Sequence, residues 1–156
     1  MMADKSTPGG DRSASGDPSP PARFPQRDDN GRIALLTELL AYTLGATALG
    51  VAMLAAIDGV FALLGFGSFG QISGWISGLL AVFIFVDDFR AWRENPMRWA
   101  IAAVGAVLGV VVGLGVVSQL PPFWLPLFNG SIAVAAGAML YSVLWFIGVR
   151  LVGGDR

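Results

Sequence analysis

The sequence predicts an all-α integral membrane protein with four transmembrane helices, paired as two hairpins, with both termini in the cytoplasm. Hydrophobic residues make up 54% of its 156 residues and charged residues only 13%, about half of the charged share of a soluble domain. The apolar residues gather into four runs, each close to the ~20 residues that cross a bilayer core. The basic residues lie outside these runs or, for Arg150, at the end of one, and with four crossings they all fall on one side.

Residues 1–30 form a first region, rich in proline, glycine and serine and almost free of apolar side chains. A segment of this composition buries too little surface to offset the entropy of the chain. We therefore predict a disordered cytoplasmic tail, which is either a solvated leader or a docking or regulatory segment. Residues 31–156 form the four-helix transmembrane domain.

The local signals at helix ends set the expected bounds. Asp28–Asn30 offer an N-cap to the first helix, and Asn95 followed by Pro96 is typical of the start of the third. The first hairpin turns either within residues 65–70 or earlier, at Asp58-Gly59, and both versions leave four spans with the same sidedness. The spans are expected at about residues 33–64, 69–86, 99–120 and 131–152, with a charged cytoplasmic hinge at residues 87–98.

The basic residues determine the predicted orientation. They lie before the first span, in the hinge or at the C-terminus, and neither of the two opposite loops carries one. The positive-inside rule assigns such basic segments to the cytoplasm. We therefore expect a multi-pass protein of a prokaryotic plasma membrane, with its termini and hinge in the cytosol. The ten residues are Lys5, Arg12, Arg23, Arg27, Arg32, Arg90, Arg93, Arg98, Arg150 and Arg156.

Two glycine ladders, a pattern called a glycine zipper, flank the hinge. Glycine recurs there at every fourth position, which places it on one helical stripe. Small residues at this spacing let another helix approach closely in lipid, where the hydrophobic effect does not drive association. We expect spans two and three to pack face to face through these ladders; alternatively, one ladder faces outward and drives self-association. The helix-packing residues are Gly70, Gly74, Gly78, Gly105, Gly109 and Gly113.

Two carboxylates lie in or beside the first span. A charged group in an apolar run is a functional-site hypothesis by default, and a buried Asp58 would be able to couple to ions or protons. However, counting ~20 residues from Leu39 places Asp58 at the outer edge of the bilayer. We therefore expect Asp58, beside Gly59, to mark a water-facing helix end. Glu38 lies at the inner mouth, within reach of Arg32 or of the hinge arginines.

The sequence contains few residues of the types that catalytic and metal sites use. The chain has no cysteine and no histidine, which removes disulfides, thiolate nucleophiles and the commonest metal ligand. The sequence offers no base beside a nucleophile and no ligand cluster, so we expect no catalytic, cofactor or metal site. A net charge of −1 provides no general attraction for nucleic acid.

In span count and size the chain resembles the small multidrug exporters. The resemblance covers general architecture only, because that family depends on a glutamate deep in its first span. Here residues 44–54 contain no acid, and Glu38 lies at the mouth of the span. The charge bias is also strong here and often weak in that family, so no residue role is carried over.

The sequence therefore favours a small non-enzymatic membrane protein, an accessory or scaffolding subunit. Its expected partners are the lipid bilayer and other membrane proteins or further copies of itself, and its uncharged, aromatic outer loops support this expectation. The alternative is a homo-oligomeric channel or small-solute transporter that uses the glycine ladders at its subunit contacts, with Asp58 or Glu38 in the path. An intramembrane enzyme is disfavoured because the necessary residue pairs are missing.

Overall fold

The computed structural model describes residues 25–28, 31–92 and 95–152, and within these ranges the regular elements are all helical. The predicted all-α class and the count of four helices are confirmed. Of the described helices, α1, α3 and α4 are long and apolar enough to cross a membrane. The elements are α1 (Leu36–Leu63), a short 3₁₀ helix η1 (Gly74–Ser77), α2 (Gly78–Ala91), α3 (Met97–Val117) and α4 (Pro126–Val152).

The second helix differs most from its predicted bounds. Gly70 is not helical but adopts φ +86°, a left-handed conformation that glycine reaches without steric cost. The first hairpin therefore turns in residues 64–73, as one of the two predicted versions had it, and the helix that follows starts late and continues to Ala91. The last helix begins earlier than predicted, at Pro126, because proline is well tolerated in a first helical turn.

The helix starts show one wrong prediction and one confirmed prediction. Asp28 does not cap α1, whose N-cap position is Leu35 with no side-chain hydrogen bond; the predicted cap residues 29 and 30 lie outside the described residues, as do residues 1–24 of the predicted tail. Before α3, the Asn95 side chain accepts a hydrogen bond from the Met97 N–H at 2.9 Å. The third helix therefore starts within two residues of its predicted position.

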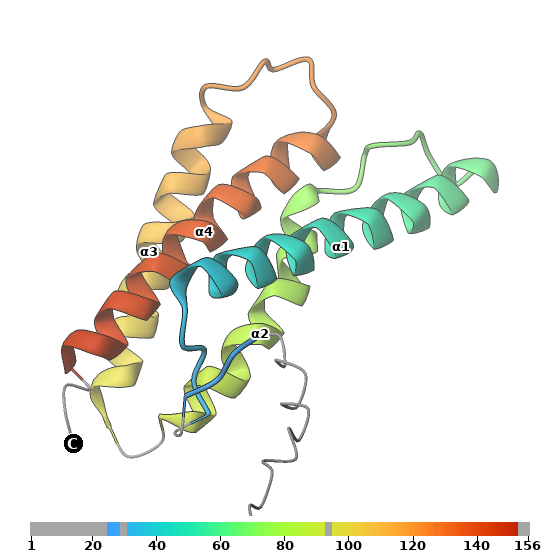
Figure 1. Cartoon of the computed structure of the whole chain (residues 1–156). Coiled ribbons are helices and arrows are strands. Elements are labelled where there is room, and N and C mark those ends of the chain that lie inside the picture. Colours follow the sequence, from blue (N-terminus) through green and yellow to red (C-terminus); the bar gives the residue numbers. More distant parts are fainter. Residues whose placement is uncertain (1–24, 29–30, 93–94, 153–156) are drawn as a thin grey trace, which may run out of the picture.

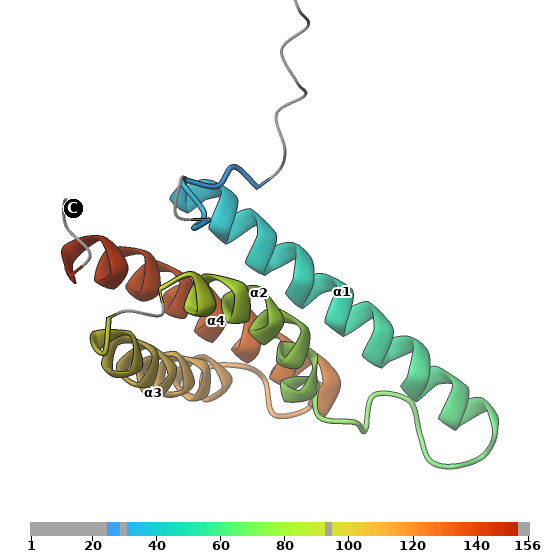
Figure 2. The same ribbon diagram turned by 90° about the horizontal axis from the view of Figure 1, so that it is seen from below.

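The helices form three layers, and α4 lies in the middle layer. Figure 2 shows α1 on one side, α3 on the other, and α2 and α4 between them. Among the described helices, α3 packs extensively only against α4, whereas α1 packs against α4, α2 and η1. Figure 1 shows α1 crossing α4 obliquely and its C-terminal part extending beyond the other helices. The central helix is therefore α4, which contacts every other helical element.

The inner face of α1 follows from its sequence. Its buried residues recur at intervals of three or four, so they occupy one stripe of the helix. Gly50 lies on this stripe directly against the carbonyl group of Ser77, where no side chain fits. The stripe consists of Leu39, Thr43, Thr47, Gly50, Leu54 and Asp58.

Candidate functional site

The first glycine ladder packs against α4. Gly74 contacts the backbone of Leu127 and Ser131, and Gly78 contacts the side chain of Val134. Gly70 lies outside the helices, where the side chain of Leu125 covers it. The ladder therefore works as a helix contact over only part of its predicted length.

The second ladder packs against the same helix. Gly105, Gly109 and Gly113 are the buried residues of α3. A Cβ built on Gly109 would lie 2.9 Å from the carbonyl oxygen of Gly137, and one built on Gly113 would lie 3.0 Å from that of Ala133. The α3 and α4 backbones are therefore in direct contact.

The expected face-to-face packing of spans two and three is thus wrong. The helical glycines of both ladders face α4, and α4 brings glycines of its own to two of these contacts. A Cβ on Gly130 would lie 2.6 Å from the Trp75 nitrogen, and one on Gly137 would lie 2.6 Å from the Gly109 oxygen. Sequence reasoning missed these two glycines because they are seven residues apart and form no four-residue ladder, although seven is also a helical repeat.

Asp58 is buried, with 3% of its surface exposed, and the prediction of a water-facing helix end is wrong. Its carboxylate accepts a hydrogen bond from the backbone N–H of Gly70. The α1 helix continues past Asp58 to Leu63, and residues 64–73 then fold back over it. Asp58 therefore fixes the returning loop to α1.

Glu38 bonds to the segment that precedes α1. Its Oε2 accepts a hydrogen bond from the backbone N–H of Gln26 at 2.5 Å, so the described partner of Glu38 is a backbone group and not an arginine. We call residues 25–28 and 31–35 the N-terminal strap. An antiparallel bridge joins Arg27 to Ile33, and Arg32 Nε pairs with Asp28 Oδ2 at 2.9 Å.

The strap lies against α4 and α2 at the end of the bundle where α1 and α3 begin, which we call the hinge end. Arg150 Nη2 donates to the Ala34 carbonyl at 2.5 Å, and the guanidinium group of Arg150 lies 4.2 Å from the Phe146 ring centroid. Arg27 Nη1 lies 3.5 Å from Asp88 Oδ1. The strap is therefore held to both neighbouring helices by charged side chains.

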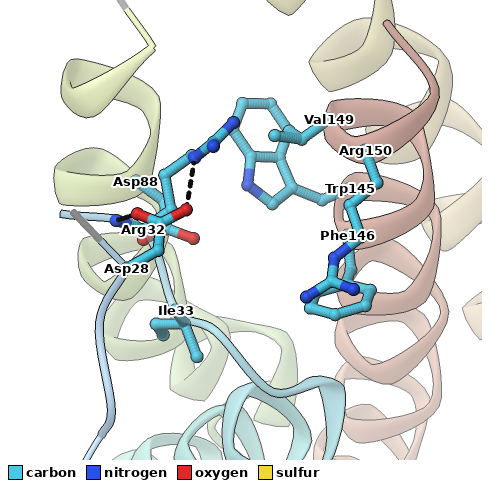
Figure 3. Close-up of a pocket in the computed structure, with 8 residues that line it drawn as sticks. All are labelled: Asp28, Arg32, Ile33, Asp88, Trp145, Phe146, Val149 and Arg150. Atoms are coloured by element: carbon cyan, nitrogen blue, oxygen red, sulfur yellow. Dashed lines mark hydrogen bonds and ion pairs between the residues drawn. The ribbon is translucent and has the colours of Figure 1, made fainter. Parts of the chain in front are cut away.

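Asp88 is the buried acid at this end, and sequence reasoning treated it only as part of a charged hinge. It is 5% exposed, and burial raises its pKa above the ordinary 3.8, against the opposing effects of Arg27 and of hydrogen bonding from the Ile33 backbone and the Trp145 side chain. Beside it lies a cavity of about 60 Å³. Figure 3 shows Asp28, Arg32 and Asp88 on one side of this cavity and Trp145 to Arg150 of α4 on the other.

The remaining buried polar side chains in the helices bond within the chain. The hydroxyl groups of Thr43 and Ser142 lie 3.0 Å apart and join α1 to α4. Thr47, Ser77 and Ser131 each donate to a carbonyl of the preceding turn. Within the described residues no group of three or more acidic, histidine or cysteine side chains converges as a metal site would require.

Comparison with known proteins adds no functional assignment to this geometry. No protein-family model matches the chain, and neither the curated proteins nor the solved structures compared with it gave a match.

Proposed function

We propose that this chain is a non-catalytic integral membrane protein, an accessory or scaffolding subunit that binds other membrane proteins. The observation that carries this proposal is the surface of the end opposite the hinge, formed by residues 63–73 and 118–125, which we call the far end. Phe66 is 76% exposed there, Phe123 82% and Leu63 89%, and neither segment contains a charged residue.

Exposed side chains of this size favour burial against another surface. Removing one such side chain from water is worth about 1.5–3 kcal/mol, so burial of several of them would supply a useful driving force. A partner with a complementary apolar surface at the same depth would provide that burial. The uncharged loops offer nothing that would select a charged solute.

The interior supports a structural role. Asp58, the buried acid of α1, accepts a hydrogen bond from the loop at Gly70, and the buried threonine and serine hydroxyl groups of the helices are bonded within the chain. These groups are used in packing, and a solute pathway or a catalytic site would require them to face a cavity. The glycine ladders, which the channel hypothesis placed at subunit contacts, contact α4 of the same chain. No observation therefore favours the channel over the accessory subunit.

The proposed orientation has four crossings, with the hinge end in the cytoplasm of a prokaryotic cell. Its support is the charge pattern, because the described arginines at helix ends, including Arg90, Arg98 and Arg150, gather at the hinge end. The chain has no cysteine, so single cysteines can be introduced without a background signal. A cysteine at Asn95 should be shielded from a membrane-impermeant thiol reagent in intact cells, and one at Ser118 should react; the reverse pattern would refute the orientation.

Site-specific photocrosslinking tests the partner surface. A photoreactive phenylalanine analogue at Phe66 or Phe123 should give one discrete protein adduct in native membranes, the same from both positions. Val104, 58% exposed in the middle of α3, is the matched control and should give only lipid adducts. Lipid adducts alone at all three positions, together with extraction of the chain as a lone monomer, would rule out the accessory role.

A further inference from the structure

An apolar groove separates α2 from α3 along the surface of α4. It has a volume of about 390 Å³ and exists because α3 packs extensively on α4 but not on α2. Small residues of α2, α3 and α4, including Gly78, Ala106 and Gly137, line its sides, together with the aromatic side chains of Trp75, Phe85 and Tyr141.

The dimensions of the groove favour a thin occupant. On α3 its lining runs from Ala102 to Val110, about 12 Å at 1.5 Å per residue. Spread over that length, 390 Å³ corresponds to a channel about 6 Å across, whereas a helix with its side chains is about 10–12 Å wide. An extended hydrocarbon chain fits within this space, whereas a helix would seat only one of its faces there.

A cation lies at the hinge end of the same groove. Arg98 precedes Ala102 by four residues, so both lie on one stripe of α3. Its guanidinium carbon lies 4.7 Å from the ring centroid of Phe89, which follows the groove residue Phe85 by four on α2. Arg98 Nη1 makes a long hydrogen bond of 3.4 Å to the Phe89 carbonyl. Among the described residues, Arg98 Nε has no hydrogen-bond partner.

The groove and Arg98 together suit a ligand that has an apolar chain at one end and an anionic group at the other. The distance from Arg98 to Val110 along α3 is about 18 Å, close to the ~15 Å hydrocarbon depth of one leaflet. Trp99, 64% exposed beside Arg98, is typical of the level of the headgroups. Arginine binds phosphate through charge-assisted, often bidentate hydrogen bonds.

We propose that the groove between α2 and α3 binds one anionic phospholipid, with an acyl chain along the groove and the headgroup phosphate on Arg98. The site is separate from the far end and does not depend on the proposed partner there. A partner helix would complement the apolar walls but not the arginine, and a free phosphate would leave the groove empty. The lipid would fill the space between α2 and α3 and join these two helices.

The test uses the full chain in nanodiscs that contain equal amounts of phosphatidylcholine and phosphatidylglycerol with identical acyl chains. Native mass spectrometry of the released protein should show one retained lipid, predominantly phosphatidylglycerol. Arg98→Gln should lower the ratio of retained phosphatidylglycerol to phosphatidylcholine about fivefold, the effect of one interfacial cation. Arg90→Gln is the matched control, since Arg90 is exposed at the same end but, one residue after Phe89, lies off the stripe of α2 that continues from the groove.

A second pair of variants tests the groove itself. Ala106→Phe should fill it and abolish lipid retention, whereas Ala100→Phe makes the same change at an exposed residue of α3 that does not line the groove. Near-ultraviolet circular dichroism checks that each variant is folded. On the unmodified chain, acyl-brominated phosphatidylglycerol should quench tryptophan fluorescence more than phosphatidylcholine brominated at the same position, because Trp75 lines the groove.

Three results would overturn the proposal. Equal losses in Arg98→Gln and Arg90→Gln would indicate diffuse attraction by the hinge end. Equal lipid retention in Ala106→Phe and Ala100→Phe would show that the retained lipid lies elsewhere. A disulfide-linked dimer or protein adduct formed efficiently through Ala106→Cys in native membranes would show that a protein occupies the groove.

Discussion

The contact between Gly109 and Gly137 gives the sharpest test of the fold. An alanine at position 137 would place its Cβ 2.6 Å from the Gly109 carbonyl oxygen. A comfortable contact needs about 3.4 Å, so α3 and α4 must move apart by about 0.8 Å. A gap of 0.5–1 Å forfeits roughly a quarter to a half of the dispersion energy of the contacts that it opens, and α3 has no other extensive helix contact to compensate.

We therefore expect Gly137→Ala to cost about 1–3 kcal/mol from overpacking, reduced by up to about 1 kcal/mol because alanine is a better helix former than glycine. Gly115→Ala is the control in α3, where an added Cβ meets nothing within 4 Å. That variant gains the helix-propensity term alone and should be slightly more stable than the parent chain.

Thermal unfolding in mild detergent, followed by near-ultraviolet circular dichroism, measures the difference. Near-ultraviolet signals are needed because helices persist in detergent after tertiary contacts are lost. The double variant Gly109→Ala with Gly137→Ala should lose less stability than the sum of the single losses, because one separation of the helices relieves both clashes. If Gly137→Ala and Gly115→Ala shift the midpoint in the same direction by the same amount, the close contact of α3 with α4 is refuted.

Two further predictions concern the buried acids. Asp58→Ala should lower the free energy of unfolding by about 1–3 kcal/mol, because the Gly70 N–H loses its acceptor, and it should speed hydrogen exchange in residues 64–73. Asp58→Asn keeps an acceptor and should behave nearly as the parent chain. Equal effects of the two variants would contradict the role of Asp58 as a loop anchor. Because burial raises the pKa of Asp88 above 3.8, the folded chain binds this proton more tightly than the unfolded chain, so stability should fall as the pH rises from 3.8 through the folded-state pKa. Asp88→Asn should remove that fall in pH-dependent thermal unfolding, and an unchanged pH profile would show that Asp88 is not desolvated.

The class of the fold and three of its long helices could be predicted because they depend on composition and run length. An apolar run near 20 residues is expected to be helical because a helix satisfies its backbone groups within one segment, and Asn95-Pro96 marks a helix start through local chemistry. The start of α2 could not be predicted from run length or from local helix-start signals. Gly70 continues a four-residue glycine period, yet the same residue type is favoured in a left-handed turn, and only the loop bonded to Asp58 decides between these states.

The environment of the carboxylates was also inaccessible to sequence reasoning. Counting residues correctly places Asp58 near one end of α1. A residue near the end of a helix is nevertheless shielded from water when a loop folds back over it. Asp88 follows Asp87 directly and precedes Arg90 by two residues, and such a charged segment is typical of a solvated surface. Its burial depends on Trp145 and on the strap residue Ile33, far from it in sequence.

The pairing of the glycine ladders shows why helix partners are harder to predict than helices. A glycine stripe indicates that some backbone approaches closely, but because glycine has no side chain it does not specify which one. Here the choice depends on α4, whose Gly130 and Gly137 meet η1 and α3 in turn, and on Thr43, which bonds to Ser142 of the same helix. With both ladders packed against α4 of one chain, contacts with other proteins must use the remaining surface. That surface includes the far end and the exposed apolar sides of α1, α2 and α3. Self-association through these glycines would require α4 to leave its place at the centre of the bundle.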